Sequence, residues 1–254
     1  MRKSAIFLLF VAFCLTILGL SAQGGIAVSP QTARTKTEAE GKQKPEDSKQ
    51  RPVAKSKVYL LHSDLLRKDA SHPDAQIVTG NVKFRHDSVY MYCDSACYYD
   101  KVSSFEAFGN VKMVQGDTLF LYGDRLYYDG LTQIAEMRCN VRMENRTTTL
   151  LTDSLNYDRV YNLGYFFDGG TLMDEQNVLT SEWGEYSPQT KQSVFNYNVK
   201  LVNPQFTLTS DTLRYNTASK IADIVGPSDI WSDANHIYSE KGTYNTVTGK
   251  ADLY

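Results

Sequence analysis

From Val58 onward, apolar and polar residues alternate in short runs separated by turns rich in Gly, Asn, Asp and Pro, a pattern typical of β-strands. The pattern has a fixed period. It is marked by six tyrosines that follow one another at intervals of 29 residues: Tyr99, Tyr128, Tyr157, Tyr186, Tyr215 and Tyr244. A strict period of this size indicates stacked copies of one supersecondary unit. The sequence therefore predicts a repetitive β structure.

Three positions measured from these tyrosines are regularly apolar. Seven residues before each tyrosine stand Tyr92, Leu121, Leu150, Leu179, Leu208 and Ile237. Two residues before stand Cys97, Leu126, Leu155, Gly184, Leu213 and Gly242. Nine residues after stand Phe108, Met137, Phe166, Phe195, Ile224 and Leu253. Stacking of the units would align these positions into continuous apolar layers.

An acidic residue marks a bend in each unit. It stands four residues before the last five tyrosines, at Asp124, Asp153, Glu182, Asp211 and Glu240, whereas Asp94 stands five residues before Tyr99. Side chains of a strand alternate between faces, so the apolar positions at −7 and −2 share one side only if the strand bends between them. Stacked carboxylates repel one another, so we expect a solvated corner where they accept hydrogen bonds from turn N–H groups. A calcium site is the alternative, but calcium takes about six or more oxygen ligands and no second acid accompanies each one.

A second signature, Asn-Val followed by a basic and an apolar residue, occurs at 81–84, 110–113, 140–143 and 198–201. Its alternation predicts a half-buried strand, and turns follow both this strand and the tyrosine, so each unit holds about two strands. After residue 57 no segment keeps a helical period over three turns. The predicted fold is all-β and repetitive. A β-solenoid (parallel β-helix) with one coil per period is the alternative.

The N-terminal 57 residues differ from the repeats. Residues 1–22 combine Arg2 and Lys3 with an apolar run and small residues at the end, which predicts a cleaved secretory signal peptide, with a membrane anchor as the alternative. Residues 23–57 are polar and contain few large apolar residues, which predicts a disordered linker. The predicted folded domain spans residues 58–254.

Composition argues against several functions. The net charge of −2 gives no basic footprint for nucleic acid. The chain has no catalytic or phosphate-binding motif and no CxxC pair, and its four histidines are scattered, so we predict neither an enzyme nor a metal or cofactor site. Cys93, Cys97 and Cys139 would remain after cleavage. The first two are too far apart on one strand to form a disulfide, and we expect small buried thiols rather than a disulfide with Cys139.

The repeats resemble the OstA-like family of periplasmic lipopolysaccharide-transport proteins, which includes bridge proteins and a domain of the outer-membrane translocon. The resemblance rests on Gly-Asn-Val at 80–82 and 109–111, and on the acid-x-Leu-x-Tyr-Asp units at 124–129 and 153–158. It covers about residues 58–254, and the unit at 168–187 departs most, with Asp-Gly-Gly in place of Asn-Val. The resemblance implies an open, V-shaped β-jellyroll of two sheets that shields the acyl chains of lipopolysaccharide in an apolar groove and passes them toward the outer membrane.

The resemblance also implies a site and partners. The expected groove lining is Leu121, Leu126, Leu150, Leu155, Leu179, Leu208, Leu213, Ile237, Phe108, Phe166, Phe195 and Ile224. Expected partners are lipopolysaccharide and the inner- and outer-membrane transport proteins. The unprotected last strand suits a head-to-tail homo-oligomer. The alternative function is a structural or adhesive scaffold whose interior is filled by its own side chains. An apolar opening would favour the carrier, and a closed, packed interior would favour the scaffold.

Overall fold

The computed structural model describes residues 56–69, 72–232 and 235–254, and these form one antiparallel sheet of nineteen strands. The long strands are β3 (His72–His86), β4 (Val89–Tyr99), β5 (Ser104–Gln115), β6 (Leu119–Asp129), β7 (Ile134–Asn145), β8 (Thr148–Asp158), β13 (Gln192–Asn203) and β14 (Phe206–Asn216). The short strands are β1 (Tyr59–His62), β2 (Leu65–Asp69), β9 (Leu163–Phe166), β10 (Gly170–Asp174), β11 (Asn177–Ser181), β12 (Trp183–Tyr186), β15 (Ile221–Ile224), β16 (Ser228–Ser232), β17 (Asn235–Ser239), β18 (Gly242–Asn245) and β19 (Ala251–Leu253). The predicted signal peptide and nearly all of the predicted linker lie outside the described residues.

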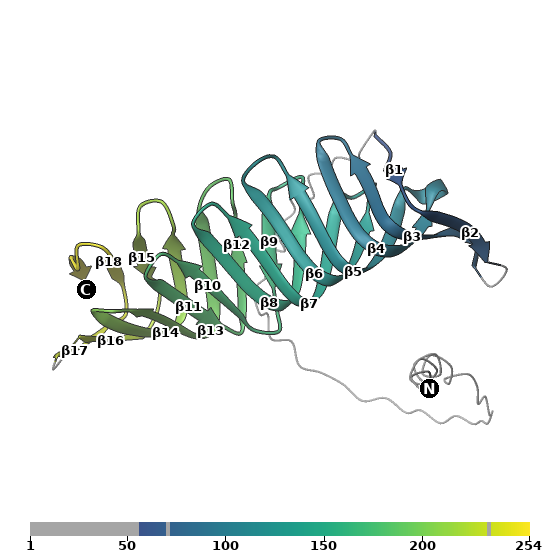
Figure 1. Cartoon of the computed structure of the whole chain (residues 1–254). Helices are drawn as coiled ribbons and strands as arrows, with labels where there is room; N and C mark the ends of the chain where they lie inside the picture. Colours follow the sequence, from purple (N-terminus) through teal and green to yellow (C-terminus); the bar gives the residue numbers. More distant parts are fainter. Residues whose placement is uncertain (1–55, 70–71, 233–234) are drawn as a thin grey trace, which may run out of the picture. The chain divides into compact units, whose positions relative to one another are not determined.

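All pairings between the described strands are antiparallel. The long strands from β3 to β8 pair in the order of the sequence, as do β13 and β14, and Figure 1 shows the strands following one another along the domain. The coils of a parallel β-helix pair in parallel, so the β-solenoid alternative is wrong. The all-β, jellyroll-like fold is confirmed.

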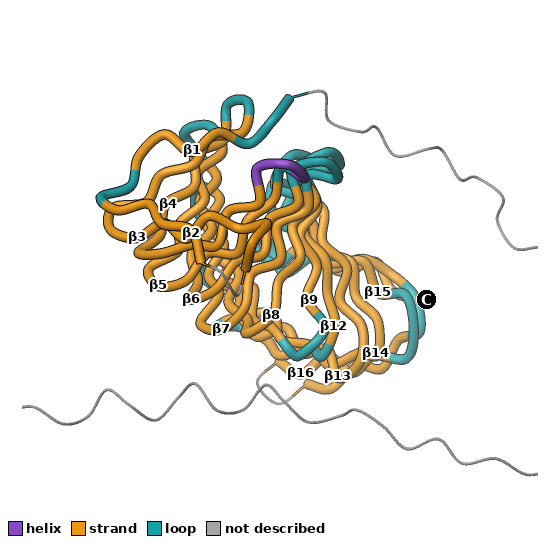
Figure 2. Tube along the Cα trace, turned by 90° about the vertical axis from the view of Figure 1, so that its right-hand side faces the viewer, coloured by secondary structure: helices purple, strands orange, loops and turns teal. Residues whose placement is uncertain are grey.

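The sheet is folded into two layers along a line that crosses the long strands. Around the departing unit the strands are interrupted at this line: β8 pairs with β10 on one side of it and with β9 on the other. Strand β14 likewise pairs with β16 and with β15. We call the layer that contains β1, β10, β11, β16 and β17 the first layer, and the layer that contains β2, β9, β12, β15, β18 and β19 the second. Figure 2, which looks along the stack of strands, shows them bending from one layer into the other.

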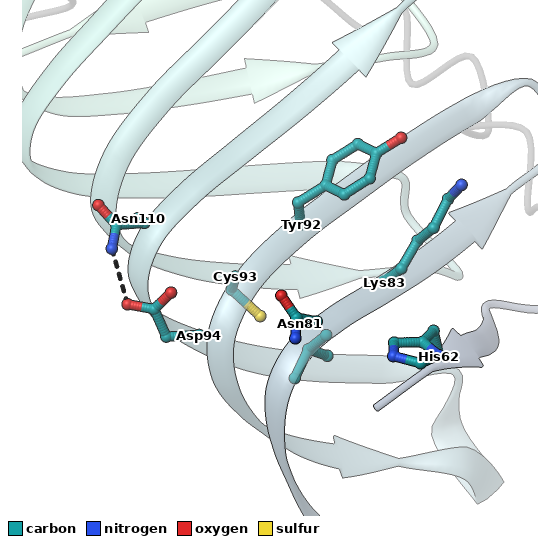
Figure 3. A pocket seen from close by; sticks show the side chains of 8 residues that line it. His62, Asn81, Lys83, Tyr92, Cys93, Asp94 and Asn110 are labelled. Atoms are coloured by element: carbon teal, nitrogen blue, oxygen red, sulfur yellow. Dashed lines mark hydrogen bonds between the residues drawn. The ribbon is translucent and has the colours of Figure 1, made fainter. Parts of the chain in front are cut away.

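The fold line, here called the corner, is a row of bulges. In β5, Gly109 and Asn110 both adopt left-handed backbone with φ of 74° and 47°, and the register with β6 shifts at this point. The Asn110 amide donates to the exposed Asp94 carboxylate at 2.8 Å, as Figure 3 shows. Equivalent amide-to-carboxylate bonds join Asn81 to Asp64, Asn140 to Asp124 and Asn198 to Glu182. The predicted bend and its exposed acids are therefore confirmed, although most of these bonds come from asparagine side chains.

The first unit is one residue out of phase with the prediction. Tyr98, not Tyr99, is buried like the other ladder tyrosines, so Asp94 stands four residues before the equivalent tyrosine. The extra residue lies after the tyrosine, in the turn that contains the short 3₁₀ helix η1 (Asp100–Val102) and the left-handed Ser103. As a result, every apolar position of the first unit moves by one residue.

We predict that Gly109→Ala destabilises the domain more than Gly116→Ala does. Both glycines have positive φ, which costs an L-residue roughly 1–2 kcal/mol. A Cβ on Gly109 would also lie 2.5 Å from Asp94 Oδ2, whereas one on Gly116 would meet nothing within 4 Å. Denaturant unfolding should show a difference of about 1 kcal/mol or more, in line with a lost hydrogen bond at the corner. Equal losses of unfolding free energy in the two variants would mean that the close approach of Asp94 to Gly109 does not matter for stability.

Candidate functional site

Ten of the twelve predicted lining side chains lie in the space between the layers. Each is no more than 2% exposed: Leu121, Leu126, Leu150, Leu155, Leu179, Leu208, Leu213, Phe166, Phe195 and Ile224. They belong to one continuous hydrophobic core that runs along the whole stack of described strands. The stacking of equivalent positions inferred from the period therefore gives a continuous apolar interior.

Phe108 and Ile237 are not in this interior. The phase error explains Phe108, because Ala107 occupies the interior position and Phe108 lies outside, with the Arg125 guanidinium 5.5 Å from its ring centroid. Ile237 is 46% exposed because β17 pairs with β16 on one side and has no described strand on the other. The prediction was wrong for both residues.

The interior also contains side chains that the predicted lining omitted. The valine of each Asn-Val signature and the apolar residue two positions later point between the layers: Val82, Val111, Val141, Val199, Phe84, Met113, Met143 and Leu201. The alternation of the signature identified these as the buried face of a strand, but did not show that this strand faces the tyrosine layer. Phe84 of the first layer stacks on Phe105 of the second with ring centroids 4.1 Å apart.

The interior is filled by these side chains rather than open. Residues from both layers are fully buried against one another, so the predicted V-shaped opening is absent from the described part. Two hollows of 320 and 520 Å³ lie on the outer side, along the corner. Figure 3 shows the first, where Lys83, Tyr92 and Asn110 are among the lining residues.

Opposite the corner, the two layers meet along a line that we call the mouth. Here the turns that end the first-layer strands face the turns that follow the ladder tyrosines, and polar side chains link them. Asp174, which is fully buried, accepts bonds from the Tyr215 hydroxyl at 2.8 Å and from Lys220 Nζ at 2.7 Å. Lys220 also pairs with Glu175 at 3.1 Å. Burial alone would lower the pKa of Lys220, but the two carboxylates raise it.

Similar links occur one repeat apart along the mouth. Lys191 Nζ donates to Asn145 Oδ1, and the Tyr186 hydroxyl donates to the same oxygen at 3.3 Å. In the preceding unit, Gln115 donates to Asn162 Oδ1 at 2.8 Å. The ladder tyrosines are thus more than markers of register, because their hydroxyl groups help to tie the layers together.

The N-terminal link uses different residues. The His86 ring lies 2.7 Å from the Tyr128 hydroxyl, and the Arg159 guanidinium donates to both groups. With Nδ1 accepting these bonds, neutral His86 carries its proton on Nε2 and donates toward Ser56, whose Oγ is 2.9 Å away. Burial and then Arg159 lower the pKa of His86, against the opposing effect of Asp87. Burial raises the pKa of Tyr128 to about 12, with Arg159 acting in the opposite direction.

Sequence reasoning missed the mouth, although a signal for it exists. Polar residues recur at 29- or 30-residue intervals where the first-layer strands end: His86, Gln115, Asn145, Asp174 and Asn203. Polar residues at the end of a strand indicate a turn, but this composition does not show what the turn faces.

The described residues hold no group of three metal-ligating side chains, so the acids of the corner form no such cluster. In the same part of the chain, no helix is long and apolar enough to cross a membrane. Cys93 is buried as expected, Cys97 is half-buried and Cys139 is exposed at a corner bulge, and no disulfide links them.

Fold and interior together define a jellyroll-like protein with a continuous apolar core between two layers. Residues 55–211 match the model of a family described as OstA-like protein, which is more than half of the chain. The chain belongs to the OstA-like family of lipopolysaccharide-transport proteins, which are not enzymes.

Similarity to individual known proteins is slight. No curated protein matches this sequence. One solved structure to which the chain is similar is LptH of Pseudomonas aeruginosa, described as the LptA homologous periplasmic component of the conserved lipopolysaccharide transport device. The identity is 10% over 54% of this chain and 93% of that chain, with a TM-score of 0.37. At so low a TM-score this likeness carries no argument.

We predict that Leu155→Ala destabilises the domain by about 2–5 kcal/mol, because it leaves a cavity in a packed core. Phe108→Ala should cost less than about 1 kcal/mol, since that ring lies outside the core. Denaturant unfolding of both variants tests the corrected phase. A larger loss from Phe108→Ala would contradict it.

We also predict that the free energy of unfolding decreases as the pH falls below about 6.5, the pKa of an unperturbed histidine. The lowered pKa of His86 means that the unfolded chain binds a proton more readily than the folded chain does. The stabilisation is complete above about pH 6.5, the pKa of histidine in the unfolded chain, and is lost progressively as the pH falls below it. His86→Gln, which copies Gln115 of the next unit, should flatten this dependence. An unchanged dependence in the variant would exclude His86 as its source.

Proposed function

We propose that the chain is a lipid-binding component of lipopolysaccharide transport that shields acyl chains between its two layers and passes them toward the outer membrane. The observation that carries this proposal is the uninterrupted apolar interior, which continues from one repeat to the next. Moving an acyl chain from an apolar surface into water costs about 0.8 kcal/mol for each CH₂ group, so acyl chains need a covered route. Similar layers in each repeat would let chains move along the stack with little change in free energy.

The closed interior requires that the layers separate before lipid enters. The corner consists of continuous backbone in the long strands, whereas the described contacts across the mouth are side-chain hydrogen bonds and the Lys220 ion pairs. A typical hydrogen bond contributes only about 0.5–1.5 kcal/mol net. Opening at the mouth with the corner as hinge therefore keeps the strand pairings, while the apolar contacts between the layers would have to be replaced by contacts with acyl chains. The acyl chains would then pack against the interior side chains in place of the opposite layer.

The second candidate is the scaffold whose own side chains fill the core. The complete burial of residues such as Leu150, Leu208 and Phe195 favours it. The two functions differ in whether lipid reaches these residues.

The rest of the route is proposed on the same basis. Residues 1–22 would direct secretion, residues 23–57 would act as a tether, and residues 58–254 would work in the periplasm between inner- and outer-membrane transport proteins. Head-to-tail assembly is supported by apolar side chains exposed at both ends of the stack. At the first end these are Tyr59, Leu61, Leu65 and Leu66, and at the last end Ile237, Tyr238 and Tyr254.

Photocrosslinking tests the carrier directly. An aliphatic diazirine of about the size of leucine, placed at Leu155 or Leu208, should form adducts with lipopolysaccharide during transport in cells. The control is Leu151, which lies on β8 with Leu155 but is 37% exposed on the outer side. Adducts at the interior positions and few at Leu151 are expected. No adduct at either interior position, or equal yields at all three, would contradict the carrier and leave the scaffold.

A further inference from the structure

One link of the mouth brings together two cations from opposite layers. Arg146 lies in the turn between β7 and β8, directly after Asn145. Lys191 comes from the turn between β12 and β13 and reaches across the mouth to donate to Asn145 Oδ1. Both cations adopt left-handed backbone, with φ of 56° and 64°. Their side chains therefore start from tight turns that face each other.

This pair lacks the carboxylate that a neighbouring cation has. Lys220, one repeat further along, contacts both Asp174 and Glu175. No ion pair of Arg146 or Lys191 is present among the described residues, and the only side-chain partner of Lys191 there is the neutral Asn145. The pKa of Lys191 is lowered by burial and then by Arg146, with Asp174 opposing this more weakly. Lys191 thus contacts a neutral amide with a second cation, Arg146, adjacent to that amide in the chain, which is an arrangement that an anion would stabilise.

We propose that Arg146 and Lys191 form a binding site for a phosphate group, that of a lipid headgroup whose acyl chains lie between the layers. This inference rests on the proposed function. When the layers part, the bond between Lys191 and Asn145 breaks and both cations become available at the point where a headgroup emerges into solvent. An Arg guanidinium can bind phosphate with two N–H groups, and the lysine adds a second charge. The phosphate would then bridge the two layers in place of the Asn145 amide.

Two substitutions, one at each end of the hydrogen bond between Lys191 and Asn145, distinguish a phosphate-binding site from a contact that only holds the layers together. Both Lys191→Gln and Asn145→Ala remove the bond between Lys191 and Asn145, and Asn145→Ala also removes the bond from the Tyr186 hydroxyl to the same oxygen. If the link only fastens the layers, both variants should change lipid binding in the same direction. If Lys191 binds phosphate, Lys191→Gln should weaken binding and Asn145→Ala, which frees the lysine, should strengthen it. Asn145→Asp, which copies Asp174 at its place beside Lys220, should neutralise Lys191 and weaken binding.

The experiment measures the affinity of the full chain for lipopolysaccharide, for the same preparation after chemical removal of its phosphates, and for inorganic phosphate. Wild type should bind the intact preparation about tenfold or more tightly than the dephosphorylated one, as charged hydrogen bonds imply. Lys191→Gln and Arg146→Gln should reduce this ratio toward one, and the exposed Lys200→Gln should leave it unchanged. Melting temperatures verify that each variant is folded. If Asn145→Ala is not, Asn145→Asp is compared with Lys191→Gln: a phosphate site predicts that both weaken binding, whereas a link that only fastens the layers predicts opposite effects, because the aspartate tightens it.

The outcomes are distinguishable. Equal wild-type affinities for the two lipid preparations would overturn the phosphate site and leave the proposed function standing. Wild type that binds neither preparation would overturn both. Tight binding of inorganic phosphate that is lost in both glutamine variants, without discrimination between the lipids, would assign the site to free phosphate and overturn the headgroup assignment. Parallel effects of Lys191→Gln and Asn145→Ala would show that the link only fastens the layers.

Discussion

The structure depends on a bend that is built into each long strand. A regular strand presents its apolar residues on one face, and a flat sheet of such strands would expose a long apolar surface to water. The paired left-handed residues at the corner, such as Gly109 and Asn110, turn the strand so that its two halves cover each other. The carboxylate of Asp94 on the neighbouring strand then accepts a hydrogen bond from the Asn110 amide, and this bond holds the bulge in place. Repetition of this device produces two layers with one shared interior.

This bend also makes the two long edges of the jellyroll unequal. At the corner the layers share backbone, while the described contacts across the mouth come from side chains such as Asp174, Lys191 and Lys220. Separation along the mouth therefore keeps the described strand pairings and breaks polar contacts of modest strength, but it also parts the apolar core, which a ligand would have to cover. Such an arrangement is compatible with a closed resting state and with an apolar interior that becomes accessible when a ligand can take the place of the opposite layer.

Much of this fold could be predicted from periodicity, because equivalent residues in stacked units must occupy equivalent places. The bend, the exposed acids and ten interior residues follow from that argument. Phe108 was misplaced because the first unit has one extra residue after its buried tyrosine, Tyr98. The next residue is also a tyrosine, and it lies 29 residues before Tyr128, so the extra residue was hidden in the sequence. Ile237 was misplaced because a repeat argument ignores the end of the stack. The mouth was missed because the polar residues that recur where the first-layer strands end do not show which turns they face. Whether the interior is open or filled depends on side-chain packing, which periodicity does not describe.

The central claim is that the layers part at the mouth to admit lipid. It is tested most directly by the distance between spin labels on Thr147 and Thr190, which lie in the facing turns on either side of the link between Asn145 and Lys191. Labels attached through unnatural residues leave the cysteines unchanged, and pulsed electron resonance gives the distance with and without lipopolysaccharide. The account predicts that the distance increases when lipid binds. An unchanged distance in protein that is saturated with lipid would contradict it.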